Sequence, residues 1–155
     1  MMTRAALGAT FALLLGAAGT AVADDHATCT AIEIAATSAK EPSMPAELKP
    51  LEKKLRKPPL SSWNSFRVLS SSSLSLDSMK VASPKLAAGA VTVILRDVDS
   101  KEGKRPRLSL GITMDGQAGK RVFDSKLTLD AGDYVVFGET LPNDDGHFVA
   151  LSCKL

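Results

Sequence analysis

The chain has 155 residues, 45% of them hydrophobic, with 19 Lys and Arg against 17 Asp and Glu. This length suits one domain with a modest core, and the nearly balanced charge argues against a nucleic-acid binder, whose affinity rests on a marked basic excess. Beyond residue 23 no apolar run is long enough to span a bilayer, so we expect no membrane span in the mature chain.

The N-terminus has the parts of a secretory signal peptide. Arg4 precedes an apolar run over residues 5–21, and Ala21 and Ala23 supply the small residues that a cleavage site requires. The alternative is an uncleaved membrane anchor, but the run ends without basic stop-transfer residues. We therefore expect cleavage of residues 1–23 and a secreted or periplasmic domain over residues 24–155.

Two cysteines, Cys29 and Cys153, lie near the two ends of the mature chain. In an oxidising compartment, two cysteines without a third predict one disulfide. Pairing within one chain and pairing between two chains both remain open. A bridge within one chain would join the first and last elements.

A metal site is the alternative use of these cysteines. His26 and His147 could join Cys29 and Cys153 around zinc or copper if the terminal strands are neighbours. Copper could also take one of the methionines, which are Met44, Met79 and Met114. A disulfide leaves neither thiolate free to bind a metal ion. We therefore expect the disulfide and not the metal site.

The first expected strand covers residues 28–37. Ile32 and Ile34 alternate with small residues, as in a strand with one buried face. Cys29 does not share that face. Either the strand begins after Cys29 or a bulge intervenes.

Residues 42–59 predict the one helix. Leu48, Leu51 and Leu55 form a narrow apolar stripe, and the two prolines at 58 and 59 end the segment. The serine-rich stretch that follows carries regularly spaced apolar residues, so we expect two short strands there, over 66–70 and 73–79.

In the second half of the chain, residues 91–96 are β-branched and mostly apolar, and residues 108–114 alternate apolar and polar side chains with the period of two that strands show. Asp115 and Gly116 form a hairpin turn signal. The expected strands cover residues 91–96, 108–114, 121–129, 134–138 and 148–153. About seven to eight strands and one short helix predict an all-β sandwich.

A six-residue motif indicates one particular kind of all-β sandwich. Leu129, Gly132 and Tyr134 resemble the L-x-x-G-x-Y corner of immunoglobulin-like and fibronectin-like sandwiches. The resemblance implies that Tyr134 opens a late strand and that its hydroxyl bonds to nearby backbone. The alternative is an ordinary glycine turn before a strand. The chain departs from antibody domains because Trp63 lacks the cysteine pair expected on either side of it.

The mature pattern as a whole is similar to small exported bacterial proteins with a β-sandwich of this immunoglobulin-like kind. That resemblance implies a secreted or periplasmic protein. It carries over no active site.

Motifs of catalysis are absent from the sequence. There is no Gly-x-Ser-x-Gly, no phosphate-binding glycine loop and no paired zinc-binding histidine motif. Residues 97–103 begin like a calcium loop, but Lys101 and Leu108 stand where oxygen ligands belong. We therefore expect no enzyme and no cofactor.

Two basic patches are candidate contact surfaces for an anionic envelope polymer or phospholipid head groups. The alternative is that they are the solvated face of the helix and a charged loop that discourages edge pairing. The first patch contains Lys49, Lys53, Arg56 and Lys57, and the second contains Lys104, Arg105 and Arg107.

These observations predict an exported, non-catalytic binding or structural module of the cell envelope. Its partner is expected to be another envelope protein or an anionic envelope polymer, and not a nucleic acid. Two other functions stay open: a periplasmic zinc- or copper-binding protein, and a small secreted hydrolase that uses His147 as a base.

Overall fold

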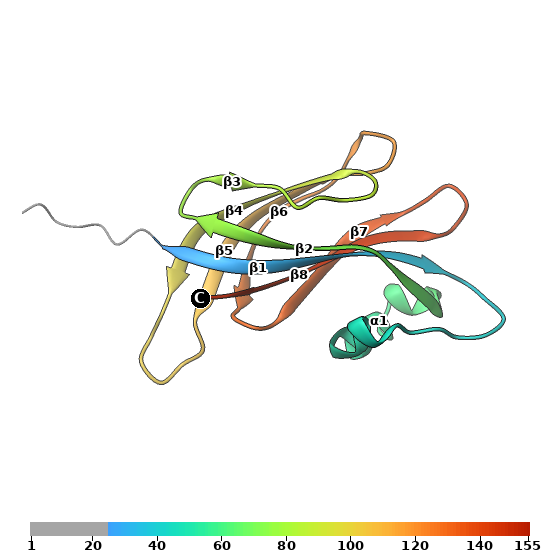
Figure 1. Cartoon of the computed structure of the whole chain (residues 1–155), viewed down its shortest axis with the longest axis horizontal. Helices are drawn as coiled ribbons and strands as arrows, with labels where there is room; N and C mark the ends of the chain where they lie inside the picture. Colours follow the sequence, from blue (N-terminus) through green and yellow to red (C-terminus); the bar gives the residue numbers. More distant parts are fainter. Residues whose placement is uncertain (1–24) are drawn as a thin grey trace, which may run out of the picture.

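The computed structural model describes residues 25–155, and the expected signal peptide at 1–23 lies outside them. Two antiparallel four-stranded sheets pack face to face in this part of the chain (Figure 1). The prediction of an all-β sandwich with one short helix is confirmed. Within the described residues, no helix is long and apolar enough to cross a membrane.

The strands of each sheet are hydrogen-bonded in a simple order. Sheet A has the order β2-β1-β8-β7 and sheet B the order β3-β4-β5-β6. Sheet A consists of β1 (His26–Thr37), β2 (Ser65–Asp77), β7 (Tyr134–Thr140) and β8 (Gly146–Lys154). Sheet B consists of β3 (Val81–Ala82), β4 (Ala90–Asp99), β5 (Arg107–Asp115) and β6 (Arg121–Asp130).

This order is a meander, because within each sheet every strand pairs with its neighbours in sequence, apart from the pairing of β8 with β1. Immunoglobulin domains connect their two sheets in Greek-key order. The chain therefore shares the sandwich architecture with that class, while its connections follow a different path. The pairing of β8 with β1 brings the two ends of the described chain side by side.

Strand β1 is buried on both faces. Ala27, Cys29 and Ala31 face the core between the sheets, whereas Ile32 and Ile34 face the other side of sheet A. The strand begins at His26, so the expectation of a start after Cys29 or a bulge within the strand is wrong. The odd-numbered set and the even-numbered set point to opposite faces of the strand, and each packs in a different core.

Strand β2 is one long strand, and the predicted break between residues 70 and 73 is wrong. Its pairing with β1 shifts by one residue, since Glu33 lies opposite Ser70 and Ile34 opposite Val68. The extra residue is Leu69. In a regular strand, two even-numbered residues point to the same face. The bulge changes this, so that Phe66 packs under the helical residues on the outer face of sheet A and Leu74 packs in the core between the sheets.

A helical segment, Ala46 to Ser62, covers the outer face of sheet A. It contains the 3-10 helix η1 (Ala46–Leu51), the short α1 (Glu52–Leu55) and the 3-10 helix η2 (Leu60–Ser62). The predicted continuous helix over 42–59 is thus too long, because Pro50 lacks the amide hydrogen that a regular helix needs. The predicted apolar stripe is confirmed, since Leu48, Leu51 and Leu55 are fully buried.

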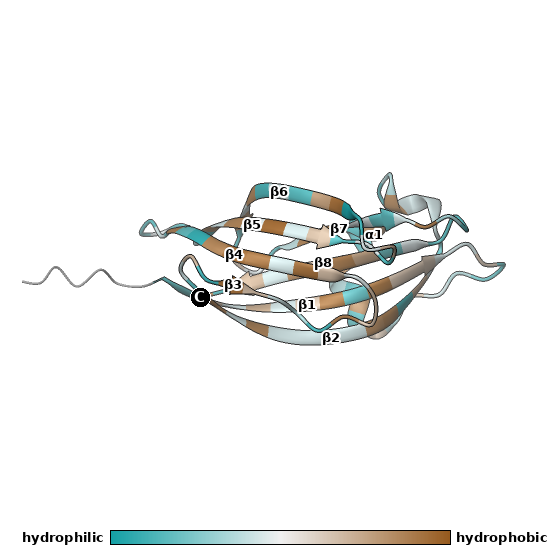
Figure 2. Cartoon of the chain, turned by 90° about the horizontal axis from the view of Figure 1, so that it is seen from above, coloured by the Kyte–Doolittle hydropathy of each residue, from teal (hydrophilic) through white to brown (hydrophobic). Residues whose placement is uncertain are grey.

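The molecule therefore has two cores separated by sheet A. The inner core lies between the sheets, and Figure 2 shows its hydrophobic segments along β4 and β5. The outer core lies between sheet A and the helical segment and includes Trp63, Phe66 and Phe148.

Candidate functional site

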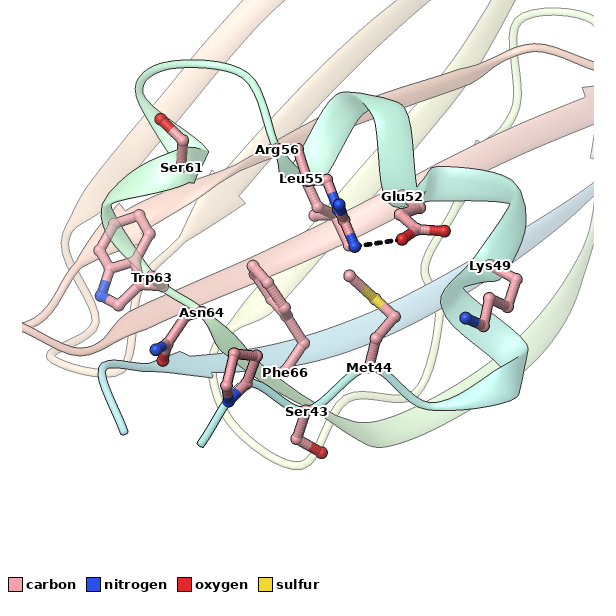
Figure 3. A pocket seen from close by; sticks show the side chains of 11 residues that line it. Ser43, Met44, Lys49, Glu52, Leu55, Arg56, Ser61, Trp63, Asn64 and Phe66 are labelled. Atoms are coloured by element: carbon pink, nitrogen blue, oxygen red, sulfur yellow. Dashed lines mark ion pairs between the residues drawn. The ribbon is translucent and has the colours of Figure 1, made fainter. Parts of the chain in front are cut away.

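A pocket of about 560 Å³ opens between the helical segment and the beginning of β2 (Figure 3). One part of its wall is apolar and the other carries charged and polar groups. The apolar lining residues are Met44, Leu55, Trp63 and Phe66, and the polar ones include Ser43, Lys49, Glu52, Arg56, Ser61 and Asn64.

Trp63 fixes one wall of this pocket. Its Nε1 donates a hydrogen bond of 2.8 Å to the carbonyl oxygen of Asp144 in the β7–β8 loop. Its ring meets Phe148 edge-on, with 5.1 Å between the ring centroids. Only 9% of the residue is exposed. The wall is therefore preformed, because Trp63 is held both by a polar bond and by aromatic packing.

The rim of the pocket is cationic. Arg56 forms an ion pair with Glu52, drawn as a dashed line in Figure 3. Lys49, Lys53 and Lys57 are exposed and make no ion pair with any described residue. The first predicted basic patch is thus largely uncompensated, and two of its members, Lys49 and Arg56, lie beside an aromatic wall.

The second predicted basic patch is compensated by carboxylates. Arg105 Nη1 lies 2.9 Å from Asp133 Oδ1, and Arg107 Nε lies 2.9 Å from Asp130 Oδ1. Lys104 lines a smaller pocket of about 230 Å³ together with these arginines. The guanidinium groups are already paired, so this loop has less free positive charge to offer an anion.

A second polar cluster is buried inside the sandwich. Glu33 and His147 are 0% and 1% exposed, and His147 Nε2 donates to Glu33 Oε2 over 2.7 Å. Glu33 also accepts hydrogen bonds from Ser70 Oγ (2.8 Å), Ala87 N (2.6 Å) and Ala88 N (3.2 Å). The carboxylate thus joins strands β1, β2 and β8 to the loop between β3 and β4.

The hydrogen bonds decide the ionisation of Glu33. Burial by itself raises the pKa of this carboxyl, but the bonds from His147, the Ala87 amide, Ser70 and the Ala88 amide together outweigh it. They hold the pKa of Glu33 below its ordinary value of 4.5. Glu33 is therefore an ionised acceptor inside the fold.

His147 is held in this pair away from solvent. His147 Nδ1 is buried and has no hydrogen-bond partner among the described residues. A catalytic base needs a nucleophile within hydrogen-bond reach and access to substrate. In this arrangement His147 holds a carboxylate instead of activating a hydroxyl or thiol group.

The structure joins the two cysteines and separates the two histidines. Cys29 and Cys153 lie directly opposite each other on β1 and β8 and form a disulfide within the chain, as predicted. Such a bond is typical of proteins from oxidising compartments. His26 Nδ1 lies 2.9 Å from Asp77 Oδ1 at the start of β1.

His147 lies opposite Ala35, near the other end of that strand. At about 3.4 Å per residue the two histidines are roughly 30 Å apart. The four residues of the predicted His and Cys metal set therefore do not meet. Within residues 25–155, no three His, Cys, Asp or Glu side chains are grouped to hold a metal ion.

Tyr134 opens β7 as the motif predicts, and Gly132 adopts a φ of +88° in the turn before it. The Gly132 amide donates to the Cys153 carbonyl oxygen over 2.8 Å. Tyr134 packs with the outer core, and its hydroxyl makes no hydrogen bond with the described residues. The sandwich-corner hydrogen bond implied by the resemblance is therefore missing, and the ordinary glycine turn describes this segment better.

Sequence reasoning missed Glu33 and the pocket. A signal for Glu33 was present, because an acidic residue between Ile32 and Ile34 in a strand must be accommodated on a face that also carries Cys29. The pocket had no local signal, since Trp63 and Lys49 come to line opposite sides of one pocket only when the helical segment folds onto sheet A (Figure 3).

No protein-family model matches the chain, and no curated protein or solved structure is significantly similar to it.

Proposed function

We propose that this protein is an exported, non-catalytic binding module of the cell envelope, and that it takes a segment of an anionic polysaccharide into the pocket beside Trp63. The observation that carries the proposal is that one pocket is lined by the aromatic rings of Trp63 and Phe66, by Lys49, which is unpaired among the described residues, and by Arg56, whose partner in an exposed ion pair is Glu52. Aromatic rings contact the apolar faces of sugar rings, while Lys and Arg pair with carboxylates.

The export part of the proposal rests on the signal-peptide pattern of residues 1–23 and on the disulfide between Cys29 and Cys153. Metal binding and hydrolysis are supported less well. The two thiolates are consumed by the disulfide, and His147 is buried against Glu33.

Trp63 provides the measurement, because it is the only tryptophan in the chain. Galacturonate oligomers are titrated into the mature protein while tryptophan fluorescence is followed. Their methyl-esterified, uncharged counterparts serve as the matched ligand control. We expect a saturable change with the charged oligomers that weakens as salt is added, because exposed charges are screened.

Charge-matched variants locate the site. Lys49→Gln with Arg56→Gln should weaken binding by about tenfold or more, since two charge-assisted contacts are lost. Arg105→Gln with Arg107→Gln removes the same charge from the compensated patch and should leave the affinity within about twofold. Equal binding of the uncharged oligomers, or equal losses in both double variants, would contradict the proposal.

A further inference from the structure

Strand β6 is an edge strand of sheet B, and it pairs by its backbone with β5 alone among the described residues. At its beginning the Phe123 ring stacks on Phe137 of β7. Two of its carbonyl groups accept local hydrogen bonds, Lys126 O from Ser125 Oγ (3.4 Å) and Asp130 O from Asp133 N (3.0 Å). Figure 2 shows β6 at one margin of the molecule. A ten-residue edge with free amide and carbonyl groups is a template for another strand.

The edge carries a bulge at its beginning and the charged side chains of Asp124 and Lys126, but most of its length is regular. The register shift between β5 and β6 lies at Val122, so the stretch from Phe123 to Asp130 is regular and contains no proline. The charged residues of this stretch point to solvent and not inward. In contrast, β3 at the opposite edge of sheet B has only two residues, which limits pairing there.

We propose that β6 pairs antiparallel with β6 of a second copy of this chain, around a two-fold axis at Ser125. This axis places Asp124 opposite Lys126 of the second copy, and the symmetry repeats the same pair on the other side of the axis. Asp124 and Lys126 share the exposed face. Arg121 Nη1 of the same chain lies 3.6 Å from Asp124 Oδ2, but the Asp124 side chain is still 68% exposed, so it can also contact Lys126 of the second copy.

Neighbouring registers are unfavourable. Moving the axis to Asp124 sets two Asp124 side chains opposite each other, and moving it to Lys126 sets two Lys126 side chains opposite each other. Like charges directly opposite destabilise a strand pair. The charge pattern therefore selects the axis at Ser125 among the nearby alternatives.

The other face of the strand supports the same register. The axis at Ser125 sets Phe123 opposite Leu127 of the second copy. Both side chains pack against the inner core but stay half-exposed in one copy. An aromatic residue opposite an aliphatic one is a favourable cross-strand pair, and pairing would cover both. The resulting interface is isologous, as two-fold dimers require.

This inference is independent of the proposed function. The pocket lies on the outer face of sheet A, and β6 is an edge strand of sheet B. Loss of dimerisation can therefore be measured without loss of ligand binding in the pocket, and loss of ligand binding without loss of dimerisation.

Two variants, one with the charge of Asp124 reversed and one with the charge of Lys126 reversed, test the pairing. Sedimentation equilibrium of the mature, disulfide-bonded protein should show a monomer–dimer equilibrium. Asp124→Lys opposes lysine to lysine and Lys126→Asp opposes aspartate to aspartate, so each should raise the dimer dissociation constant by roughly tenfold or more. A mixture of the two variants restores both opposite-charge pairs and should dimerise within about threefold of the unchanged protein.

The controls carry the same charge changes away from β6. Glu47→Lys and Lys53→Asp lie on the exposed side of the helical segment and should leave dimerisation unchanged. Circular dichroism checks that every variant is folded. A protein that stays monomeric up to its solubility limit, a dimer insensitive to Asp124→Lys, or a mixture that fails to associate would each overturn the inference.

Discussion

Glu33 ties the loop between β3 and β4 to sheet A. Four donors from two strands and one loop converge on a carboxylate that is fully buried. A buried charge without such partners costs several kcal/mol, so each donor is part of the reason that Glu33 is tolerated there. The loop that carries Ala87 and Ala88 is tied to the sheet through this side chain.

Replacing the charge tests that role. Glu33→Gln should lower the free energy of unfolding by about 2 kcal/mol or more, because charge-assisted hydrogen bonds inside the fold are lost. Urea denaturation followed by circular dichroism measures the change. Glu47→Gln removes an exposed charge and should alter stability by less than about 0.5 kcal/mol.

The pH dependence has a defined sign. The pKa of Glu33 is lowered in the folded state, so its charge stabilises the fold above the ordinary value of 4.5 and the contribution is lost as the pH falls through the folded pKa. The stability gap between the unchanged protein and Glu33→Gln should be widest near pH 7 and narrow near pH 3. A gap that is constant over this range would contradict the assignment.

At the scale of elements, the helical segment gives sheet A a second buried face. Its leucines and Trp63 cover apolar residues of β1 and β8 that would otherwise face solvent. Because the helical pieces are short and the first, a 3-10 helix, contains Pro50, packing and not helix propensity must hold the segment in place. The same packing forms the pocket.

Leu51→Ala tests whether packing of the leucines holds the helical segment in place. Leu51 is fully buried, so the change removes apolar contacts and leaves a cavity, with a loss of about 2–5 kcal/mol. Trp63 emission should shift to longer wavelength as the outer core loosens. Leu60→Ala, at a half-buried position in the same segment, should cost clearly less. Equal stability of Leu51→Ala and the unchanged protein would show that the segment is not held by its leucines.

At the scale of the whole molecule, the disulfide closes the described chain almost end to end. It joins Cys29 and Cys153, which are separated by 124 positions in sequence, on two strands that already pair by hydrogen bonds. In the chain-entropy model a bridge of this span restricts the unfolded chain strongly, although real bridges deliver less. The bond therefore stabilises the meander where its last strand meets its first.

The double variant Cys29→Ala with Cys153→Ala should lose about 2–5 kcal/mol of unfolding free energy. Reductant should destabilise the unchanged protein by a similar amount and leave the double variant unaffected, which separates the bond from the packing of its side chains. Unchanged stability after removal of both cysteines would refute this role.

Most of the secondary structure and the disulfide can be predicted from the amino-acid sequence. Residues 108–114 predict β5 because a strand buried on one face repeats every two residues, and the β-branched, apolar residues 91–96 predict β4. The two cysteines predict their own bond, since no other cysteine competes for either partner. These properties depend on local pattern or on composition.

Which faces are buried and which charges remain free depends on how the two sheets and the helical segment pack in space. β1 is buried on both sides because sheet A separates two cores, and the bulge at Leu69 follows from that requirement. Glu33 meets His147 across 114 positions of sequence. Arg105 is neutralised by Asp133 while Lys49 stays uncompensated, since ion pairing depends on distances in space that sequence spacing does not contain.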